Sequence, residues 1–350
     1  MSQYVCDFLK SSDFPRLKDA WKNLEKGKDM TFYQSFEWFE MLQKKNSKLF
    51  YKDKVYFGVI KDSQDNIVLV APLFIKKSFF PIVYKNGVYF YGMGSFSDYS
   101  NFIYDNINDD IFSSLFRSII ERFNLNVFYF DYLQEETKLY DYIIRNAIIE
   151  YDHSGVSVGL AMPDNIDDYS NLLSKSARQN IRTALNRLDK DNVNYVVNFD
   201  DTHVNISEFE FHRNKRVKKK EKVRLNVLSI KLALMAIFDN LRIQTKKYYP
   251  YKDLGISRFL TVMDRDNNKL MSAVNYGFSK NRKEIVAMSV SLNEEYKRYS
   301  PGIIGWYKYI TSNMGNNNVK FVDFTRGTEN YKYVLGGTTH HLHFTKFYMK

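Results

Sequence analysis

The chain has 350 residues and a mass of 41.6 kDa, which indicates two compact units or one large one. Hydrophobic residues make up 44% and aromatic residues 17%, with only 15 Gly and 6 Pro, and this composition excludes collagen, low-complexity disorder and a disulfide-stapled miniprotein. The single cysteine, Cys6, cannot form an internal disulfide. No apolar run reaches the ~20 residues that span a bilayer, and no secretion signal is visible, so a cytoplasmic location is expected.

The net charge of +11 is unevenly distributed along the chain. Residues 1–155 carry a net charge of −2, whereas residues 156–350 carry +13. A basic half suits an anionic ligand, such as a phosphorylated cofactor, a nucleotide-sugar, RNA or an anionic surface. A solvated basic surface explains the same charge, so charge alone does not decide between these alternatives.

Apolar residues three and four apart predict helices, and runs of β-branched and aromatic residues predict strands. In the first half these patterns predict a helix over 35–45, strands over 54–61, 67–76 and 84–91, a helix over 110–123, a strand over 127–132, a helix over 136–149 and a strand over 156–161. Helices over 165–188 and 207–224 follow. The second half then predicts a helix over 225–240, strands over 257–263, 270–278 and 284–292, a helix over 302–314, a strand over 319–324, a helix over 328–335 and a strand over 341–348.

The second half thus repeats the order of elements of the first. The segment Phe130 to Gln134 matches Val322 to Arg326, and each is followed by a polar turn and a helix with tyrosine. We expect a mixed α/β fold of two tandem units, residues 1–160 and 161–350. The second unit is expected to carry a basic helical segment over 207–240.

A short segment after the strand over 284–292 has the composition of a phosphate-binding helix start. Ser300 and Pro301 suit the N-cap and the first position of a helix, and Gly302 and Gly305 would let a ligand approach the backbone. The first N–H groups of a helix lack an intrahelical partner and the helix dipole adds positive potential, so such an end attracts a diphosphate. We expect these four residues and Arg298 to bind a cofactor; a simple helix cap is the alternative.

The order strand, glycine-bearing turn, helix, strand and tyrosine-bearing helix is that of the GNAT acyltransferases. Downstream of the turn stand Asp323-Phe324-Thr325-Arg326-Gly327 and Tyr331-Lys332. Together with Ser-Pro-Gly, this pattern resembles the GNAT-like acyltransferase family associated with cellulose biosynthesis, which is similar to the tandem-GNAT FemABX transferases. The resemblance is specific over 298–332 and loose in the first half, which lacks Ser-Pro-Gly. It implies a tandem fold whose second half binds acetyl-CoA or another acyl-CoA.

GNAT-type chemistry passes the acyl group directly from a thioester to an amine or hydroxyl, which requires a base, an oxyanion donor and an acid for the leaving thiolate. A backbone amide within 286–291 is the expected oxyanion donor. The resemblance places Tyr331 as the acid, although Tyr333 competes and a packing role is the alternative. Asp323 is the candidate base, or orients the amine; alternatively it pairs with Arg326 or Arg178 and only holds the loop.

Six residues are expected to bind the substrate on the basis of the resemblance: Asp98, Tyr99, Arg178, His212, Arg326 and Lys332. For Asp98 a turn role is the alternative. The run from His212 to Arg224 holds eight Lys and Arg in thirteen residues and fits either phosphate contact or a solvated helix; without interleaved aromatic residues it does not indicate base stacking. Three histidines, His340, His341 and His343, lie on the last predicted strand, and alternation puts His341 and His343 on one face. No carboxylate or other third ligand is visible at metal spacing, so no metal site is expected.

These patterns leave three hypotheses for function. The first is an acyl-CoA-dependent transferase that N-acetylates an amine or amino sugar of a sugar-nucleotide or polysaccharide precursor. The second is a FemABX-like transferase that takes its acyl group from aminoacyl-tRNA, which the basic half favours. The third is a non-catalytic scaffold in glycan assembly. The acceptor, the acyl chain length and the oligomeric state are not readable from the sequence.

Overall fold

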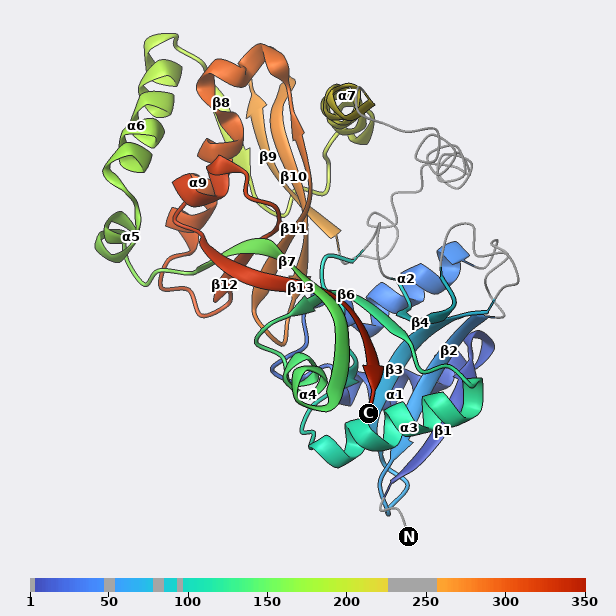
Figure 1. Cartoon of the computed structure of the whole chain (residues 1–350). Coiled ribbons are helices and arrows are strands. Elements are labelled where there is room, and N and C mark those ends of the chain that lie inside the picture. Colours follow the sequence, from blue (N-terminus) through green and yellow to red (C-terminus); the bar gives the residue numbers. More distant parts are fainter. Residues whose placement is uncertain (1–3, 47–53, 78–84, 93–96, 226–256) are drawn as a thin grey trace.

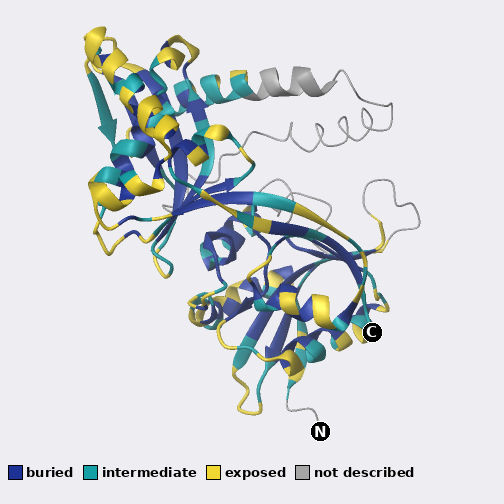
Figure 2. Cartoon of the chain, turned by 60° about the vertical axis from the view of Figure 1, so that its left-hand side comes forward, coloured by how far each residue is buried: buried dark blue, intermediate teal, exposed yellow. Residues whose placement is uncertain are grey.

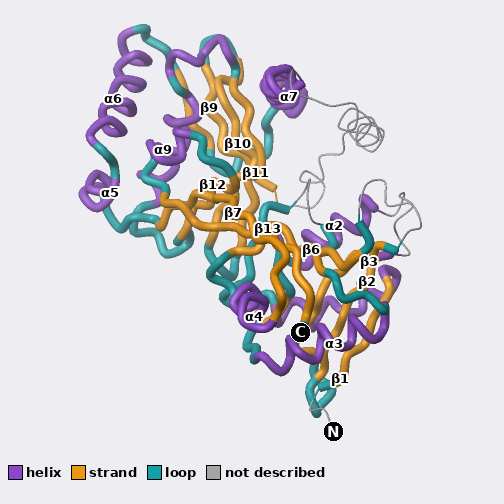
Figure 3. The backbone as a smooth tube through the Cα atoms, in the orientation of Figure 1, coloured by secondary structure: helices purple, strands orange, loops and turns teal. Residues whose placement is uncertain are grey.

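The computed structural model describes residues 4–46, 54–77, 85–92, 97–225 and 257–350. Its strands form one continuous mixed sheet in the order β1-β2-β3-β4-β6-β13-β7-β12-β11-β10-β9-β8, with β5 added beside β3. Figure 1 shows two halves joined through the long strands β7 and β13, and Figure 3 shows helices packed around each half of the sheet. The mixed α/β fold with two related units is as predicted.

The first half comprises six strands and four α-helices in the described residues. The strands are β1 (Val5–Lys10), β2 (Val55–Lys61), β3 (Ile67–Lys76), β4 (Gly87–Phe90), β5 (Ile103–Tyr104) and β6 (Phe128–Gln134), and the helices are α1 (Lys18–Leu24), α2 (Phe36–Asn46), α3 (Asp109–Phe123) and α4 (Lys138–Asn146). Short 3-10 helices precede α1 and α2, at Ser11–Leu17 and Phe32–Gln34.

The second half repeats this order. After β7 (Ala147–Ala161), the linking helices α5 (Ile166–Leu172) and α6 (Lys175–Lys190) lead to β8 (Tyr195–Asn198), α7 (Ile206–Leu225), β9 (Ser257–Asp264), β10 (Lys269–Ser279), β11 (Glu284–Leu292), α9 (Pro301–Asn313), β12 (Phe321–Arg326), α10 (Asn330–Val334) and β13 (Thr338–Met349). A 3-10 helix, Glu294–Tyr299, connects β11 to α9. Among the helices of the described ranges, none combines the length and apolarity needed to span a bilayer.

The two halves exchange strands at their junction. The C-terminal strand β13 lies between β6 and β7 of the first half, and β7 lies between β13 and β12 of the second half. The β13–β7 pair runs in antiparallel register from Thr338↔Gly159 to Met349↔Ala147. Because each half borrows a strand from the other, neither half can complete its part of the sheet from its own segment alone.

The hydrophobic core is divided along the same lines (Figure 2). The first core contains the fully buried Trp21, Phe57 and Phe116, and it extends into the second half through Val286 on β11. The second core packs α9 onto the sheet through Trp306, among others. Helix α3 illustrates how sequence produces this packing, because its buried residues recur every three or four positions and each contributes about 1.5–3 kcal/mol on burial.

Several boundaries differ from the predicted ones. The helix predicted over 136–149 ends at Asn146, and strand β7 begins directly at Ala147 rather than at 156. The helix predicted over 165–188 is two helices, because the Ser174 side chain caps a new helix by accepting a hydrogen bond from the Ala177 N–H. Strands β1, β5 and β8 and helix α1 were not predicted. The helix predicted over 225–240 and the end of the basic segment 207–240 lie outside the described residues beyond Leu225, where α7 ends.

Candidate functional site

Strands β11 and β12 run parallel but separate after a short stretch. Their register covers Glu284↔Phe321, Ile285↔Val322 and Val286↔Asp323, and within the described residues no further pair follows although β11 continues to Leu292. Beyond the last pair, the Thr325 hydroxyl donates to the Ala287 carbonyl at 3.1 Å. A bulge at Met288, between residues paired to Tyr276 and Asn275, leaves one extra residue in β11. The bulge lies within 286–291, the segment in which the oxyanion donor is expected.

Helix α9 begins beside this separation with an unusual N-terminus. Ser300 adopts the left-handed conformation, with φ 50° and ψ 49°, and its side chain makes no capping hydrogen bond. The Ser300 carbonyl accepts from the N–H groups of Ile303 and Ile304, at 2.9 and 3.2 Å. Since Pro301 has no N–H, Gly302 contributes the one first-turn amide that no described residue accepts. A Cβ built on Gly302 would meet nothing within 4 Å, so this turn faces open space.

A cavity of about 230 Å³ lies at this helix start. Helices α6, α9 and α10 form its walls. The lining residues are Asn180, Thr183, Ala184 and Arg187 on α6, Ser300 and Ile303 at the start of α9, and Asn330, Tyr331 and Val334 on α10. Asn180, Thr183 and Arg187 give this cavity side chains that can donate hydrogen bonds to an anion such as a phosphate.

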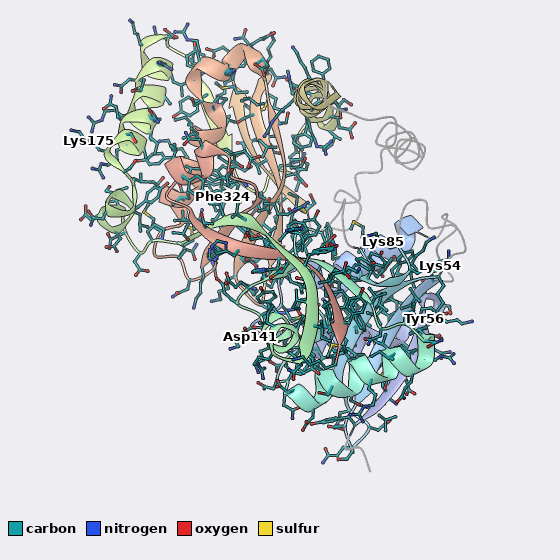
Figure 4. All side chains as sticks on the ribbon, viewed as in Figure 1. Lys54, Tyr56, Lys85, Asp141, Lys175 and Phe324 are labelled. Atoms are coloured by element: carbon teal, nitrogen blue, oxygen red, sulfur yellow. The ribbon has the colours of Figure 1, made fainter. Side chains whose placement is uncertain are left out.

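Tyr331 lies between this cavity and strand β12. Its ring makes an edge-to-face contact with Phe324 at 6.3 Å between centroids, and Figure 4 labels Phe324 on β12 and Lys175 at the start of α6. No described residue hydrogen-bonds the Tyr331 hydroxyl. Burial raises the pKa of Tyr331, and the negative charge of Glu329 adds a smaller increase. Tyr333 is 37% exposed and its hydroxyl bonds Thr339, so the cavity is lined by Tyr331 and not by its competitor.

A cluster of the predicted site residues lies at the junction of the two halves. Asp98, in the loop after β4, forms an ion pair with Arg326 at the end of β12, and the Tyr33 hydroxyl donates to Asp98 at 3.1 Å. The Arg326 guanidinium also stacks over the Tyr132 ring, 4.0 Å from its centroid. Contacts from the first half therefore fix the end of β12 close to the separation of β11 and β12.

The neighbouring residue Tyr99 makes a second connection across the junction. Its hydroxyl donates to Asp323 at 2.8 Å, and the same carboxylate oxygen accepts from the Thr325 N–H at 2.7 Å. Burial raises the pKa of Asp323 well above its usual range, and the negative charge of Glu284 on β11 adds a smaller increase. Burial likewise raises the pKa of Glu284. Asp323 therefore pairs with Tyr99 rather than with Arg326 or Arg178, and its carboxyl retains a proton more readily than an exposed aspartate does.

Lys332 connects the cavity to this junction. Its ammonium donates to the carbonyls of Thr325, Arg326 and Gly327, at 2.9, 2.7 and 3.1 Å. It also pairs with Glu329, and its side chain is only 2% exposed. With its donors used inside the protein, Lys332 holds the loop that follows β12, and this geometry gives no support to substrate contact.

The structure places the remaining predicted residues elsewhere. Arg178 donates to the carbonyls of Ser170 and Leu173, so it caps α5. His212 lies near Glu208 on α7, at 3.9 Å, and burial lowers the pKa of its imidazole. Glu208 accepts from the Leu270 N–H at the start of β10, and nothing brings His212 to the cluster around Asp98.

Two predicted cofactor residues also have other partners. Gly305 is buried, and a Cβ there would lie 2.9 Å from Val262, so its missing side chain permits close packing of α9 on β9 rather than approach of a ligand. Arg298 pairs with Asp191 at the end of α6, and the Tyr299 hydroxyl donates to the same carboxylate.

Sequence reasoning missed Glu284 and the α6 residues of the cavity. Glu284 opens a strand that was predicted correctly, but nothing in the sequence shows that its carboxyl turns inward. Arg187, Asn180 and Thr183 lie on one face of α6, and their spacing is the only signal that could have grouped them.

No protein-family model matches the sequence, and no curated protein sequence is similar to it. Among solved structures, the chain is similar to FemX, with 12% identity, 97% of both chains covered and a TM-score of 0.58. It is also similar to a conserved protein of unknown function from Bacteroides thetaiotaomicron, with 10% identity, 99% of this chain and 100% of that chain covered and a TM-score of 0.51. A third similar structure is the C-terminal domain of a putative lysylphosphatidylglycerol synthetase from Agrobacterium fabrum, with 8% identity, 96% and 93% covered and a TM-score of 0.52.

Identities this low show a shared fold and nothing more. The expected mixed α/β fold is confirmed: the chain shares the fold of FemX, and the cavity at the start of α9 lies in its second half.

Proposed function

We propose that the protein is an acyltransferase that takes its acyl group from acetyl-CoA or another acyl-CoA and passes it directly to an amine. The observation that carries this proposal is the cavity at the start of α9, whose wall residue Tyr331 contacts Phe324 on β12, the strand that separates from β11. The open turn at Gly302 suits a phosphate. The acceptor we propose is the amino group of a sugar-nucleotide or polysaccharide precursor, as the family resemblance implies.

The chain's own groups fit the steps of such a transfer. An acyl-CoA would supply the activated thioester. Tyr331 is protonated at neutral pH, and since no described residue hydrogen-bonds its hydroxyl, it can donate that proton to the departing sulfur. Asp323 is the candidate base; burial raises its pKa to about 8, so it can accept a proton only at mildly alkaline pH, and the Tyr99 hydroxyl fixes its orientation from the first half. The bulge at Met288 supplies the amide for the oxyanion.

Calorimetric titration of the folded protein with acetyl-CoA and with CoA tests the donor. We expect saturable binding of both ligands, and release of a free thiol when an accepted amine is added. Absence of any heat at millimolar ligand would remove the proposal. Binding without thiol release across a panel of amines and amino sugars would instead indicate a scaffold that retains the fold but not the turnover.

A FemABX-like transfer from aminoacyl-tRNA is the second candidate, and the position of α7 favours it. Arg213 of this basic helix reaches the Ser289 hydroxyl on β11 at 2.7 Å, close to the bulge. Phosphate contacts weaken steeply with salt, so a gel shift of tRNA at increasing salt distinguishes this candidate. Salt-dependent tRNA binding together with no binding of CoA would replace the first proposal by the second.

A further inference from the structure

The start of α9 supplies too little by itself to hold a diphosphate. In the first turn of α9 only the Gly302 amide lacks a described acceptor, because Pro301 has no N–H and the next two amides bond the Ser300 carbonyl, and Gly302 itself is not among the residues that line the cavity. A diphosphate carries at least two negative charges. The cavity must therefore obtain positive charge from another element.

Arg187 on the linking helix α6 supplies a positive charge to the wall of this cavity. Its side chain lines the cavity, and one guanidinium N–H donates to the Arg298 carbonyl at 2.9 Å, just before α9 begins. Within the described residues Arg187 makes no ion pair, and its remaining N–H groups are available to a ligand. Arg298, which sequence reasoning assigned to the cofactor, is already neutralised by Asp191.

Two polar residues share the face of α6 that carries Arg187. Asn180 and Thr183 precede it by seven and four positions, a spacing that places all three side chains on one side of the helix. Hydroxyl and amide groups can donate to phosphate oxygens, and a guanidinium binds them in pairs. This wall of the cavity thus offers several donors to an anion.

We infer that Arg187 binds a phosphate of the acyl donor, with Asn180 and Thr183 beside it, so that the helix linking the two halves forms the far wall of the donor site. The inference rests on the proposed function for the identity of the donor. A cavity of about 230 Å³ is smaller than the ~300–1,000 Å³ of sites that enclose a whole drug-sized ligand. It therefore encloses the phosphates, and the nucleoside extends outward along α6.

Calorimetry with three related ligands tests this inference. Pantetheine carries no phosphate, 4′-phosphopantetheine carries one and CoA carries all of them. In Arg187→Ala we expect CoA and 4′-phosphopantetheine to bind about 10- to 100-fold more weakly, the range for loss of hydrogen bonds to a charged group, while pantetheine binds as in the wild type. Arg187→Lys should retain part of the affinity, because it keeps the charge but loses the paired donors.

Arg182→Ala is the matched control, since it removes the same charge from an exposed position of α6 that does not line the cavity. If Arg187→Ala binds CoA like the wild type, the inference is wrong and the proposed function stands. If the wild type binds neither CoA nor 4′-phosphopantetheine, the proposed function fails and inorganic pyrophosphate becomes the probe. Pyrophosphate binding that Arg187→Ala abolishes would support the phosphate site for another donor, and absence of pyrophosphate binding would overturn it.

Discussion

The two halves of the sheet each contain a parallel pair of strands that separates, but the surroundings of the two separations differ. In the first half, β4 and β6 pair at Val88↔Phe128 and Tyr89↔Tyr129 before they diverge. The rings of Phe90 and Phe130 then pack at 4.1 Å between centroids. In the second half, Tyr331, which lines the cavity of about 230 Å³, contacts Phe324 on β12.

The helices that follow these strands also differ, at their N-termini. Helix α3 of the first half begins with Asn108, whose side chain accepts from the Ile111 N–H, and its first turn carries Asp109 and Asp110. These groups satisfy the helix start and repel a phosphate. Helix α9 begins without a side-chain cap and without an acidic residue in its first turn. Of the two helix starts, that of α9 therefore suits a phosphate better, and the candidate donor site lies in the second copy.

The two halves differ in their sites but share one sheet, because β13 lies between β6 and β7. We expect a chain truncated after Gly337, which lacks β13, to lose the folded state altogether, because β6 and β7 would both lose their partner. Circular dichroism and size-exclusion chromatography measure this outcome. A truncated chain that stays monomeric and melts cooperatively would show that the halves are independent.

Closing the open turn of the second half should abolish donor binding. Gly302→Glu fills the space in front of the turn and adds a negative charge where a phosphate would lie. We expect no detectable CoA binding by calorimetry at unchanged melting temperature. The matched change in the first half, Asp110→Lys, should leave CoA affinity unchanged. Wild-type affinity in Gly302→Glu would contradict the assignment of the phosphate.

The acid role of Tyr331 predicts a smaller loss, confined to turnover. We expect Tyr331→Phe to lower kcat about 100-fold with little change in CoA affinity, because a phenyl ring keeps the packing against Phe324 but cannot donate a proton. Tyr333→Phe is the control and should behave as the wild type, since that hydroxyl bonds Thr339 at the surface. Equal rates in the two variants would assign Tyr331 a packing role.

The mildest effect is expected for Asp323→Asn, as a change in how the free energy of unfolding depends on pH. Its pKa is raised in the folded protein, so the folded state binds this proton more tightly than the unfolded state, and the free energy of unfolding falls as pH rises above the ordinary aspartate pKa. Asp323→Asn cannot bind this proton. Its free energy of unfolding, measured with urea, should therefore rise relative to that of the wild type between pH 4 and pH 8.

The corresponding first-half residue, Asp131, provides the comparison for this measurement. Burial alone raises its pKa, and it is only half-buried, so Asp131→Asn should show the same trend more weakly. A difference between Asp323→Asn and the wild type that stays constant with pH would show that the carboxyl is ionised throughout.

The sequence predicted the elements whose signals are local. Phe130 to Gln134 and Val322 to Arg326 both lie in strands, β6 and β12, as predicted. Each contains a residue with positive φ, Tyr132 at 63° and Thr325 at 61°, although the residue-for-residue match places Tyr132 opposite Phe324, one position before Thr325. Strand β7 was cut short because its partner is β13, far away in the sequence, and its exposed first part carries polar residues. The pairing of Tyr99 with Asp323 could not be predicted for the same reason, since it depends on how the two halves meet.

Hydrogen exchange with and without acetyl-CoA tests the central claim most directly, since it reads both helix starts in one experiment. The account predicts that acetyl-CoA slows exchange over 300–305, 330–335 and the cavity face of α6, and leaves 108–114 at the start of α3 unchanged. Protection at the start of α3, or none at the start of α9 under saturating acetyl-CoA, would contradict it.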